Sequence, residues 1–360
     1  MRRSGRASLE YGVQLHLPTY KGMPVHELVK LGKAAEAGGV SQLWVTDNLQ
    51  GRHIFVVLAS LAANLRVKLG TAVMVQYFRN PVDAADALAS ISELLEGREL
   101  TVGIGQGQPI TFSLMKVLRP IATLRETAQC LRRLFTGEAV SFGDYPALAA
   151  YFNFVPEAVF HLECVPKSVI NLYCGGNGPM SLAVGGAYFD GLIVGPMFQS
   201  HAGSGRLSSI LRTFDQSAER AGRTSPPRRV GEIKLSVSQD RGAAREFVRR
   251  GVGSRILSLR RRHGYSDEEM QRLGVAPEAI HQLERASKPG TSGDEFRHLV
   301  TDKMIDAVCV AGDAVYCQGR IAELSAMARE YGFEQLMFSE LGPDTNEAMR
   351  LLCDHILPTL

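Results

Sequence analysis

The feature that most constrains the fold of this 360-residue chain is a repeated alternation of short apolar runs with segments of helical periodicity. Eight apolar runs occur: Tyr11–Leu17, Ser41–Asp47, Val67–Met74, Leu100–Gly105, Val169–Gly176, Gly191–Gly195, Arg229–Ser238 and Gln335–Glu340. Nearly continuous apolar runs are typical of parallel strands, because their crossover helices bury both faces of the sheet. We therefore predict an α/β fold, an eight-stranded parallel TIM barrel. A doubly wound open sheet is the alternative, although it tolerates fewer strands.

The segments between these runs predict the helices and one insertion. Helices are expected at Val25–Ala37, Gly51–Asn64, Val82–Leu95, Thr123–Phe135, around Leu182, at Leu207–Ala221 and from Asp313 onward. Residues 241–300 are polar and read as a helical insertion between the seventh and eighth strands. Barrels with insertions reach this length, so residues 1–360 are predicted to form a single domain. The insertion's composition predicts a mobile lid over the mouth of the barrel.

Composition narrows the class of protein and of partner. Apolar residues make up 45% of the chain and charged residues 21%, as in soluble globular proteins. The net charge is only +3 and the basic residues are dispersed, which disfavours a nucleic-acid partner. No long apolar segment follows the basic N-terminus, so we expect neither a signal peptide nor a membrane anchor, and a cytoplasmic location.

The six cysteines show no spacing typical of a metal site. Free thiols in a reducing compartment account for them best. The histidines and acidic residues also lack a ligand motif, such as two histidines one helical turn apart, so we expect no metal.

Polar residues recur where the predicted strands end. Gln14 and His16 lie in the first strand, and Asp47 and Asn48 close the second. In a TIM barrel the active site lies at the carboxyl ends of the strands, which makes these residues candidates. Each also has a structural explanation: Asp47 and Asn48 are suited to capping the next helix, and His16 to a hydrogen-bonded place in the core.

The stretch "YCGGNGPM" after the fifth strand is the strongest single motif. Its glycines, Gly175, Gly176 and Gly178, allow close approach to backbone amides, and Pro179 suits the first turn of a helix. Unpaired amides at such a helix start bind phosphate. A turn without a ligand is the alternative. The dinucleotide fingerprint does not fit, because it belongs after the first strand.

Taken in order, these motifs resemble the luciferase-like flavin and deazaflavin oxidoreductases. The resemblance rests on "LWVTDNL", "VKLGTAVMVQYFRNP", "ELLEGRELTVGIGQG", "TLRETAQCLRRLFTGE", "GGNGPMSLAVGGAYFDGLIVG" and "LGPD", and it spans about Tyr11 to Leu357. Within the family, "TDN", "YFRNP" and "GIGQG" look closest to methylenetetrahydromethanopterin reductase and related enzymes. These enzymes use the 8-hydroxy-5-deazaflavin coenzyme (factor 420).

The resemblance implies roles for particular residues. A bulge with a cis peptide between Ala72 and Val73 would back the coenzyme ring. The loop Gly175, Gly176, Asn177 and Gly178 would hold the phosphate, and Asp47 would bind near the ring or polyol. Gln106 and Gln108 are candidates for contacts with the coenzyme chain or the substrate, and Gly107 for a contact with the coenzyme. A homodimer is also implied.

Two positions depart from the family pattern. Gln14 stands where these reductases often carry Glu, and Asn48 where many members carry His. Amides cannot act as general acids, so either His16, His53 or a water takes that role, or the reaction needs no acid from the enzyme. The expected function is hydride transfer between the deazaflavin coenzyme and a small organic molecule. A monooxygenase that uses reduced FMN and a noncatalytic flavin-binding protein are the alternatives.

Overall fold

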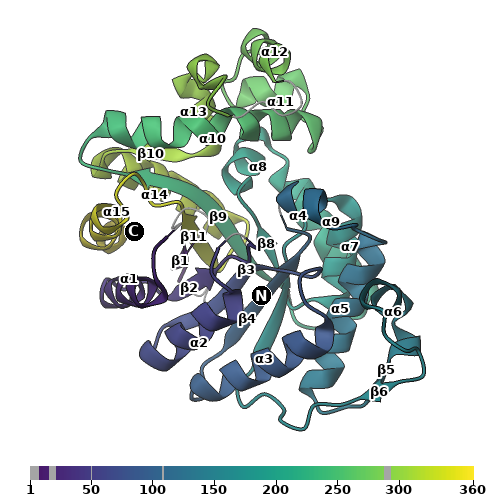
Figure 1. Ribbon diagram of the computed structural model, residues 1–360. Helices are drawn as coiled ribbons and strands as arrows, with labels where there is room; N and C mark the ends of the chain where they lie inside the picture. The colour runs from purple at the N-terminus through teal and green to yellow at the C-terminus, as the bar shows by residue number, and fades with distance from the viewer. Residues whose placement is uncertain (1–7, 16–21, 50, 108, 288–292) are drawn as a thin grey trace, which may run out of the picture.

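The sheet closes into a barrel of eight parallel strands (Figure 1). The computed structural model describes residues 8–15, 22–49, 51–107, 109–287 and 293–360. The barrel strands, in spatial order, are β1 (Glu10–Leu15), β2 (Gln42–Val45), β3 (Lys68–Val75), β4 (Leu100–Gly105), β7 (Ile170–Cys174), β8 (Gly191–Val194), β9 (Arg228–Val237) and β11 (Gln335–Ser339). Pairing of β8 with β9 and of β11 with β1 completes the ring. The predicted barrel is confirmed, and the open sheet is excluded.

Three short strands were not predicted. β10 (Val310–Gly312) extends the sheet by pairing with the last residues of β9, Leu235 to Val237. β5 (Val140–Ser141) and β6 (Val159–Phe160) form a small antiparallel pair outside the barrel. Runs of two or three residues are too short to show a periodicity in the sequence.

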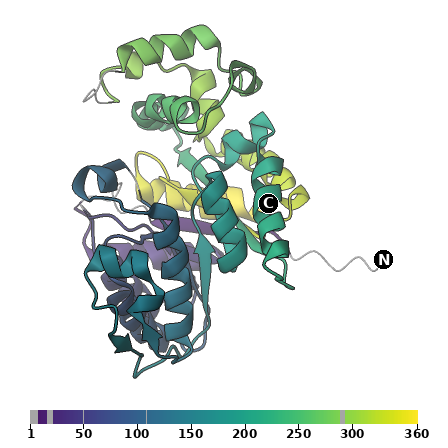
Figure 2. The ribbon, with the colours of Figure 1, turned by 90° about the vertical axis from the view of Figure 1, so that its right-hand side faces the viewer.

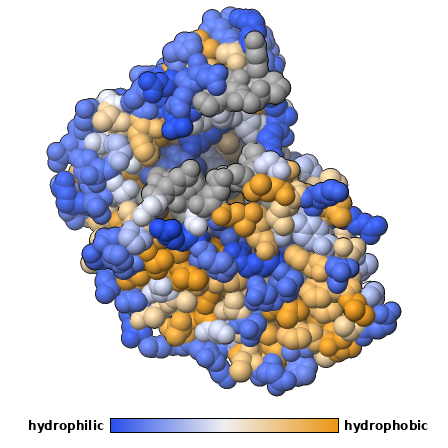
Figure 3. All heavy atoms as spheres, viewed as in Figure 1, coloured by the Kyte–Doolittle hydropathy of each residue, from blue (hydrophilic) through white to orange (hydrophobic). Residues whose placement is uncertain are grey.

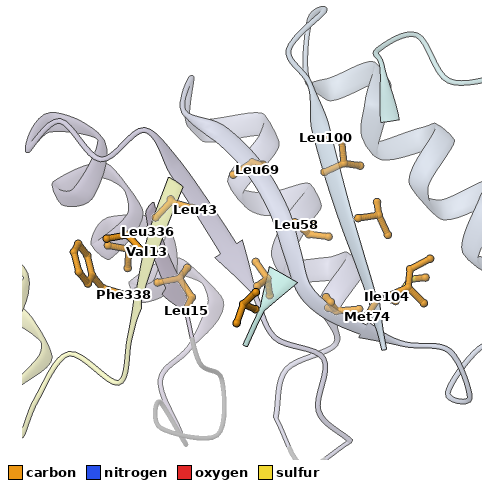
Figure 4. Close-up of a cluster of buried hydrophobic side chains, with 14 of the residues drawn as sticks. Val13, Leu15, Leu43, Leu58, Leu69, Met74, Leu100, Ile104, Leu336 and Phe338 are labelled. Carbon is orange, nitrogen blue, oxygen red and sulfur yellow. The ribbon is translucent and has the colours of Figure 1, made fainter. Parts of the chain in front are cut away.

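Most helices cover the outside of the barrel, and the others form a lobe above it. They are α1 (Val25–Ala37), α2 (Ile54–Asn64), α3 (Pro81–Leu94), α4 (Pro109–Leu114), α5 (Pro120–Phe135), α6 (Pro146–Phe152), α7 (Pro179–Tyr188), α8 (Phe198–Ser204), α9 (Leu207–Arg220), α10 (Arg241–Arg261), α11 (Asp267–Arg272), α12 (Pro277–Ala286), α13 (Asp302–Val308), α14 (Ala314–Glu330) and α15 (Thr345–Leu351). Helices α1, α2, α3, α5, α7 and α9 pack each against the next around the sheet. Their apolar side chains meet the outward faces of the strands in the main core (Figure 4).

Local signals in the sequence set several helix starts. Asn80 caps α3 by accepting a hydrogen bond from the backbone amide of Asp83, and Pro81 takes the first position. Two predicted starts need correction: the second helix begins at Ile54 instead of Gly51, and α5 begins at Pro120 instead of Thr123. Proline at the first position explains the earlier start of α5, because its missing amide is not needed there.

One tryptophan fills the inside of the barrel at its amino end. Trp44 of β2 is fully buried, and its Nε1 donates a hydrogen bond to Gln335 Oε1 at 2.7 Å. A Cβ at Gly70 or Gly12 would stand 2.7 Å or 2.9 Å from the indole, so only glycine fits beside it. The interior is therefore packed at this end, and ligands must enter from the carboxyl ends of the strands.

The insertion forms a helical lobe above one side of the barrel (Figures 1 and 2). The lobe comprises α10 to α13 and has its own buried apolar cluster, which Met197 joins from the barrel side. It continues through α13, beyond the predicted end at residue 300. Side chains of α8 fasten it, because Gln199 Nε2 donates to the carbonyl of Cys309 and Ser200 Oγ to that of Ala307. The single-domain organisation and the lid motion stay predictions.

Candidate active site

The end of β3 bulges into the mouth of the barrel. The register of β3 against β4 shifts there, and the peptide bond between Ala72 and Val73 is cis, as the family resemblance implied. The carbonyl oxygen of Ala72 accepts hydrogen bonds from Gln14 Nε2 at 2.6 Å and from Thr46 Oγ1 at 3.3 Å. Polar side chains of β1 and the end of β2 thus hold the backbone of the bulge.

Two glycines leave room for the side chain of Val73. A Cβ added to Gly175 would stand 2.3 Å from Val73 Cγ1, and one added to Gly105 would stand 3.0 Å from Cγ2. Carbon atoms do not pack that closely, so a side chain at Gly175 would displace Val73. Val73 and the two glycines make an apolar floor that spans the ends of β3, β4 and β7.

Asp47 is bound on both carboxylate oxygens. Arg79 Nη1 donates to Oδ2 at 2.6 Å and Nη2 to Oδ1 at 3.1 Å, while the backbone amide of Val75 donates to Oδ2 at 3.0 Å. Its side chain is almost fully buried. The alternative that Asp47 caps the next helix is wrong, because that helix begins at Ile54 and its cap position is His53. Asp47 instead joins the end of β2 to the bulge and to Arg79.

Arg79 has three kinds of partner at the rim of the mouth. Besides Asp47, its Nε donates to His53 Nε2 at 3.2 Å, and its guanidinium lies over the ring of Phe55, 4.9 Å from the centroid. His53 Nε2 is thereby occupied as an acceptor. Asn48 follows Asp47, and its carbonyl accepts a hydrogen bond from the amide of Gly51. The predicted residues His16 and Gln108 lie outside the described residues.

The glycine-rich loop leads into α7 as predicted. Gly178 is the residue before the first turn, and Pro179 takes the first helical position. A Cβ at Gly178 would meet nothing within 4 Å, whereas one at Gly176 would stand 2.6 Å from Ser181 Cβ. Asn177 Oδ1 is buried and has no hydrogen-bond partner among the described residues. The loop therefore offers open space and an unused acceptor beside a helix start.

The fourth strand contributes a second loop at the mouth. Gln106 and Gly107 follow β4 and are partly exposed, and Gly107 has a φ of 81°, which favours glycine. Gln14, opposite, keeps a buried Oε1 without a partner in the described part of the chain. The structure thus places the predicted residues of β1, β3, β4 and β7 around one opening.

Buried charges line another side of the mouth, and three of the four are residues that the sequence did not single out. Lys234 Nζ lies 2.9 Å from Glu232 Oε1 and 3.5 Å from Glu340 Oε1, and Arg255 of α10 also pairs with Glu340. Burial alone lowers the pKa of the Lys234 ammonium, but Glu232 and Glu340 outweigh it, so the pKa is raised. We call these four residues the charge cluster. One signal was readable in the sequence: Glu232 and Lys234 alternate with Ile233 and Leu235 along β9, so the two charged residues share one face of the strand.

The hollow between the lobe and the barrel has hydrophilic residues in its floor (Figure 3). No group of three or more metal-ligating side chains occurs among the residues that the structure describes. Burial raises the pKa of the Cys174 and Cys309 thiols to about 11, so neither is a ready nucleophile. No helix within the described ranges is long and apolar enough to span a bilayer.

The sequence and the fold were compared with those of known proteins. The luciferase-like monooxygenase family matches residues 7–330. The 5,10-methylenetetrahydromethanopterin reductase of Archaeoglobus fulgidus is 28% identical over 94% of this chain and 97% of its own length. An F420-dependent glucose-6-phosphate dehydrogenase of Intrasporangium calvum is 30% identical over 76% of this chain and 85% of its own. The structure of coenzyme F420-dependent tetrahydromethanopterin reductase from Methanopyrus kandleri superposes with a TM-score of 0.74, at 22% identity, over 98% of this chain and 99% of that one.

Proposed function

Because the chain belongs to the luciferase-like monooxygenase family, we propose that it is an oxidoreductase that transfers hydride between coenzyme F420 and a small organic substrate. The glucose-6-phosphate dehydrogenase relative and the solved tetrahydromethanopterin reductase, whose names both include F420, support this coenzyme. We infer the small organic substrate from the same relatives.

The observation that carries the proposal is the apolar floor formed by Val73, Gly105 and Gly175. A flat, uncharged ring face needs an apolar surface on one side and free space on the other. Val73 supplies the surface, and the glycines keep the neighbouring strand ends free of side chains. A Cβ at Gly195, which follows the next strand, would lie 3.7 Å from Glu232 Oε2 and 3.9 Å from Asn177 Nδ2, so polar side chains border the floor on that side.

The loop before α7 fits the phosphate of such a coenzyme. Backbone amides at the first turn of a helix have no partner within the helix and attract anions. Gly178 leaves them accessible, and the unpartnered Asn177 Oδ1 and Gln14 Oε1 can accept hydrogen bonds from the coenzyme. The residues present therefore fit the group.

Each part of the mouth then has a task. The coenzyme, when bound, supplies the hydride chemistry. Gln14 and Thr46 fix the Ala72 carbonyl, and through it the height of the floor on which the ring rests. Asp47 and Arg79 are proposed to bind the coenzyme at the ring or polyol, and Gln106 and Gly107 its chain or the substrate. The lobe would exclude water above the reacting atoms.

Titration of the protein with F420 and with FMN tests the proposal. Trp44 is the single tryptophan of the chain and lies directly below the mouth, so its fluorescence reports on binding there. We expect saturable quenching by F420 at micromolar concentration and much weaker quenching by FMN. Reduction of F420 with an alcohol or other hydride donor under anaerobic conditions would complete the test. Preference for FMN, with oxygen consumption when it is reduced, would establish the monooxygenase alternative instead.

Two further outcomes are distinguishable in the same experiments. Tight F420 binding without turnover on any hydride donor would favour a noncatalytic flavin-binding protein. A homodimer and a cytoplasmic location are proposed on family resemblance, and light scattering of the purified protein measures the first.

A further inference from the structure

Several large apolar side chains are exposed around one half of the mouth. Among the described residues, the segments that follow β2, β4 and β7 carry five of them: Leu49, Phe112, Leu114, Leu118 and Met180. We call these five residues the apolar rim. Because β2, β3, β4 and β7 are consecutive in the barrel, the three segments lie on the same half of its carboxyl end. Figure 3 shows apolar residues on the barrel side of the hollow.

The apolar rim is more exposed than isolated surface leucines require. Leu114 is 60% exposed, Leu118 is 51% exposed and Met180 is 68% exposed. A single exposed apolar side chain is ordinary on a protein surface. Several of them in neighbouring segments are typical of a surface that contacts another apolar surface. The apolar rim therefore indicates an interaction surface at the mouth.

The segments that carry the apolar rim are basic. Three of their residues are exposed and positively charged: Arg52, Lys116 and Arg119. Residues 46–53, 106–119 and 175–180 contain one acidic residue, Asp47, and its charge is paired with Arg79. The rim thus combines apolar side chains with uncompensated positive charge.

The lobe adds a further basic residue beside the rim. Arg262 is exposed at the carboxyl end of α10, and its guanidinium lies 5.8 Å from the centroid of the Phe112 ring. An arginine in this position can keep its apolar stem beside the ring and extend its charged end to a polar layer above it. The basic surface therefore continues from α4 to the lobe.

The charges decide between a second copy of the chain and a lipid surface as the occupant of the rim. In a two-fold contact between copies the same patch meets itself, so Lys116 and Arg119 would face like charges. A bilayer with anionic lipids has the opposite properties. Its acyl boundary takes up apolar side chains, and its headgroups attract lysine and arginine.

We propose that the apolar rim and its basic neighbours dock the mouth of the barrel on an anionic lipid bilayer. The contact is peripheral: Leu114, Leu118 and Met180 enter the headgroup region, and Lys116 and Arg119 lie against lipid phosphates. A contact of this kind needs no spanning helix. It does not depend on coenzyme F420, so it stands or falls separately from the proposed function.

Co-sedimentation of the full chain with vesicles tests the proposal. The vesicles contain phosphatidylglycerol and phosphatidylcholine in equal parts, or phosphatidylcholine alone. We expect saturable binding to the anionic vesicles and binding at least about tenfold weaker to the neutral ones, because each basic residue near an anionic surface strengthens binding about fivefold. Raising the salt concentration from about 0.1 M to about 1 M should weaken binding to the anionic vesicles, because it screens these charges.

Two variants probe the two components of the surface. Leu114→Ser should weaken binding about tenfold or more, since a leucine no longer enters the apolar layer. Lys116→Gln should weaken it about fivefold through the loss of one charge. Val169→Ser and Lys167→Gln are the matched controls and should bind like wild type. Val169 is 61% exposed, as Leu114 is, and Lys167 is exposed, but both precede β7 at the amino end of the barrel.

Three results would overturn the inference. Wild type that binds neither kind of vesicle excludes a lipid surface, and equal, salt-independent binding to both kinds excludes the role of the basic residues. Leu114→Ser that binds as tightly as Val169→Ser excludes the apolar rim as the contact. A mass of two chains by light scattering for wild type, reduced to one chain in Leu114→Ser, would instead assign the rim to a second copy. Thermal melting of each variant confirms that it is folded.

Discussion

The ion pair between Asp47 and Arg79 allows a sharp test of what holds the mouth together. Asp47→Asn removes the charge that balances a guanidinium whose side chain is only 11% exposed. Removing one partner of a buried pair typically costs about 3 to 5 kcal/mol of stability. Arg79 keeps its contact over Phe55, and such contacts contribute about 0.5 to 2 kcal/mol. We therefore expect a loss near the lower end, about 3 kcal/mol.

The double variant Asp47→Asn with Arg79→Met is the control. It removes both charges, so stability should recover to within about 1 kcal/mol of wild type, because replacing a buried pair by apolar groups is often neutral. Urea unfolding of wild type, both single variants and the double variant closes the cycle. A coupling energy below about 0.5 kcal/mol, the usual deviation for independent sites, would refute the role of the pair.

The same variants test whether Asp47 binds the coenzyme. A hydrogen bond to a charged group contributes about 1.5 to 3 kcal/mol, so losing one should weaken F420 binding roughly tenfold or more. If the double variant recovers stability but not affinity, the pair itself contacts F420. Unchanged affinity in Asp47→Asn would contradict the predicted role at the ring or polyol.

Three further perturbations probe other parts of the structure. Gly178→Val should weaken F420 binding without loss of stability, since the position of its Cβ is open. Gly319→Val on α14, where the Cβ position is equally open, is the control and should leave F420 affinity unchanged. Equal F420 affinities in the two variants would show that the coenzyme phosphate does not bind at Gly178. Gly175→Ala should lower both stability, by about 1 to 3 kcal/mol, and F420 affinity, because its methyl group would overlap Val73; wild-type melting and binding would show that the floor is not as described. Burial, with help from the charges of His263 and Arg206, lowers the pKa of His201 to about 3, while Tyr265 hydrogen-bonds its Nδ1. In the unfolded chain this histidine is protonated below about pH 6.5, so its contribution to stability should be complete above that pH and fall as pH drops toward 3, by up to about 1.4 kcal/mol per pH unit. In His201→Gln, the free energy of unfolding measured in urea should fall less steeply with decreasing pH. An equal dependence on pH in wild type and variant would contradict the lowered pKa of His201.

The sequence predicted the barrel because its signals are local. Each strand is a contiguous apolar run, and the helix starts carry Pro or a capping residue close by, as at Asn80 and Pro81. β10 was not predicted because its three residues show no periodicity, and they form a strand only because the tertiary fold places them beside the end of β9. The start of α2 was misplaced because Gly51 to His53 continue the helical pattern in sequence but not in the backbone.

The candidate site was predictable only in part. The loop at Gly178 could be predicted because its glycines and Pro179 constrain the backbone of adjacent residues, and this is visible in the sequence. The partner of Asp47 lies 32 residues away and that of Glu340 lies 85 residues away, on the insertion. Such pairs depend on how strands and helices meet, so a sequence alone shows the charge but not its counterion. A helix cap therefore stayed open as the alternative role of Asp47.

The length of β9 bears on how this enzyme can be re-engineered. Its first residues, Arg228 to Lys234, pair within the barrel, and its last, Leu235 to Val237, pair with β10 beneath the lobe. The strand β9 thus runs without interruption from the barrel to the base of the lobe, with Glu232 and Lys234 near its middle. A lobe grafted from a relative with the end of its own β9 would change the twist of this strand and so the directions of the Glu232 and Lys234 side chains. Exchanges that join the parts after Val237 and before β10 would keep β9, β10 and α14 intact, so at these junctions the lobe can be replaced while the barrel is left unchanged.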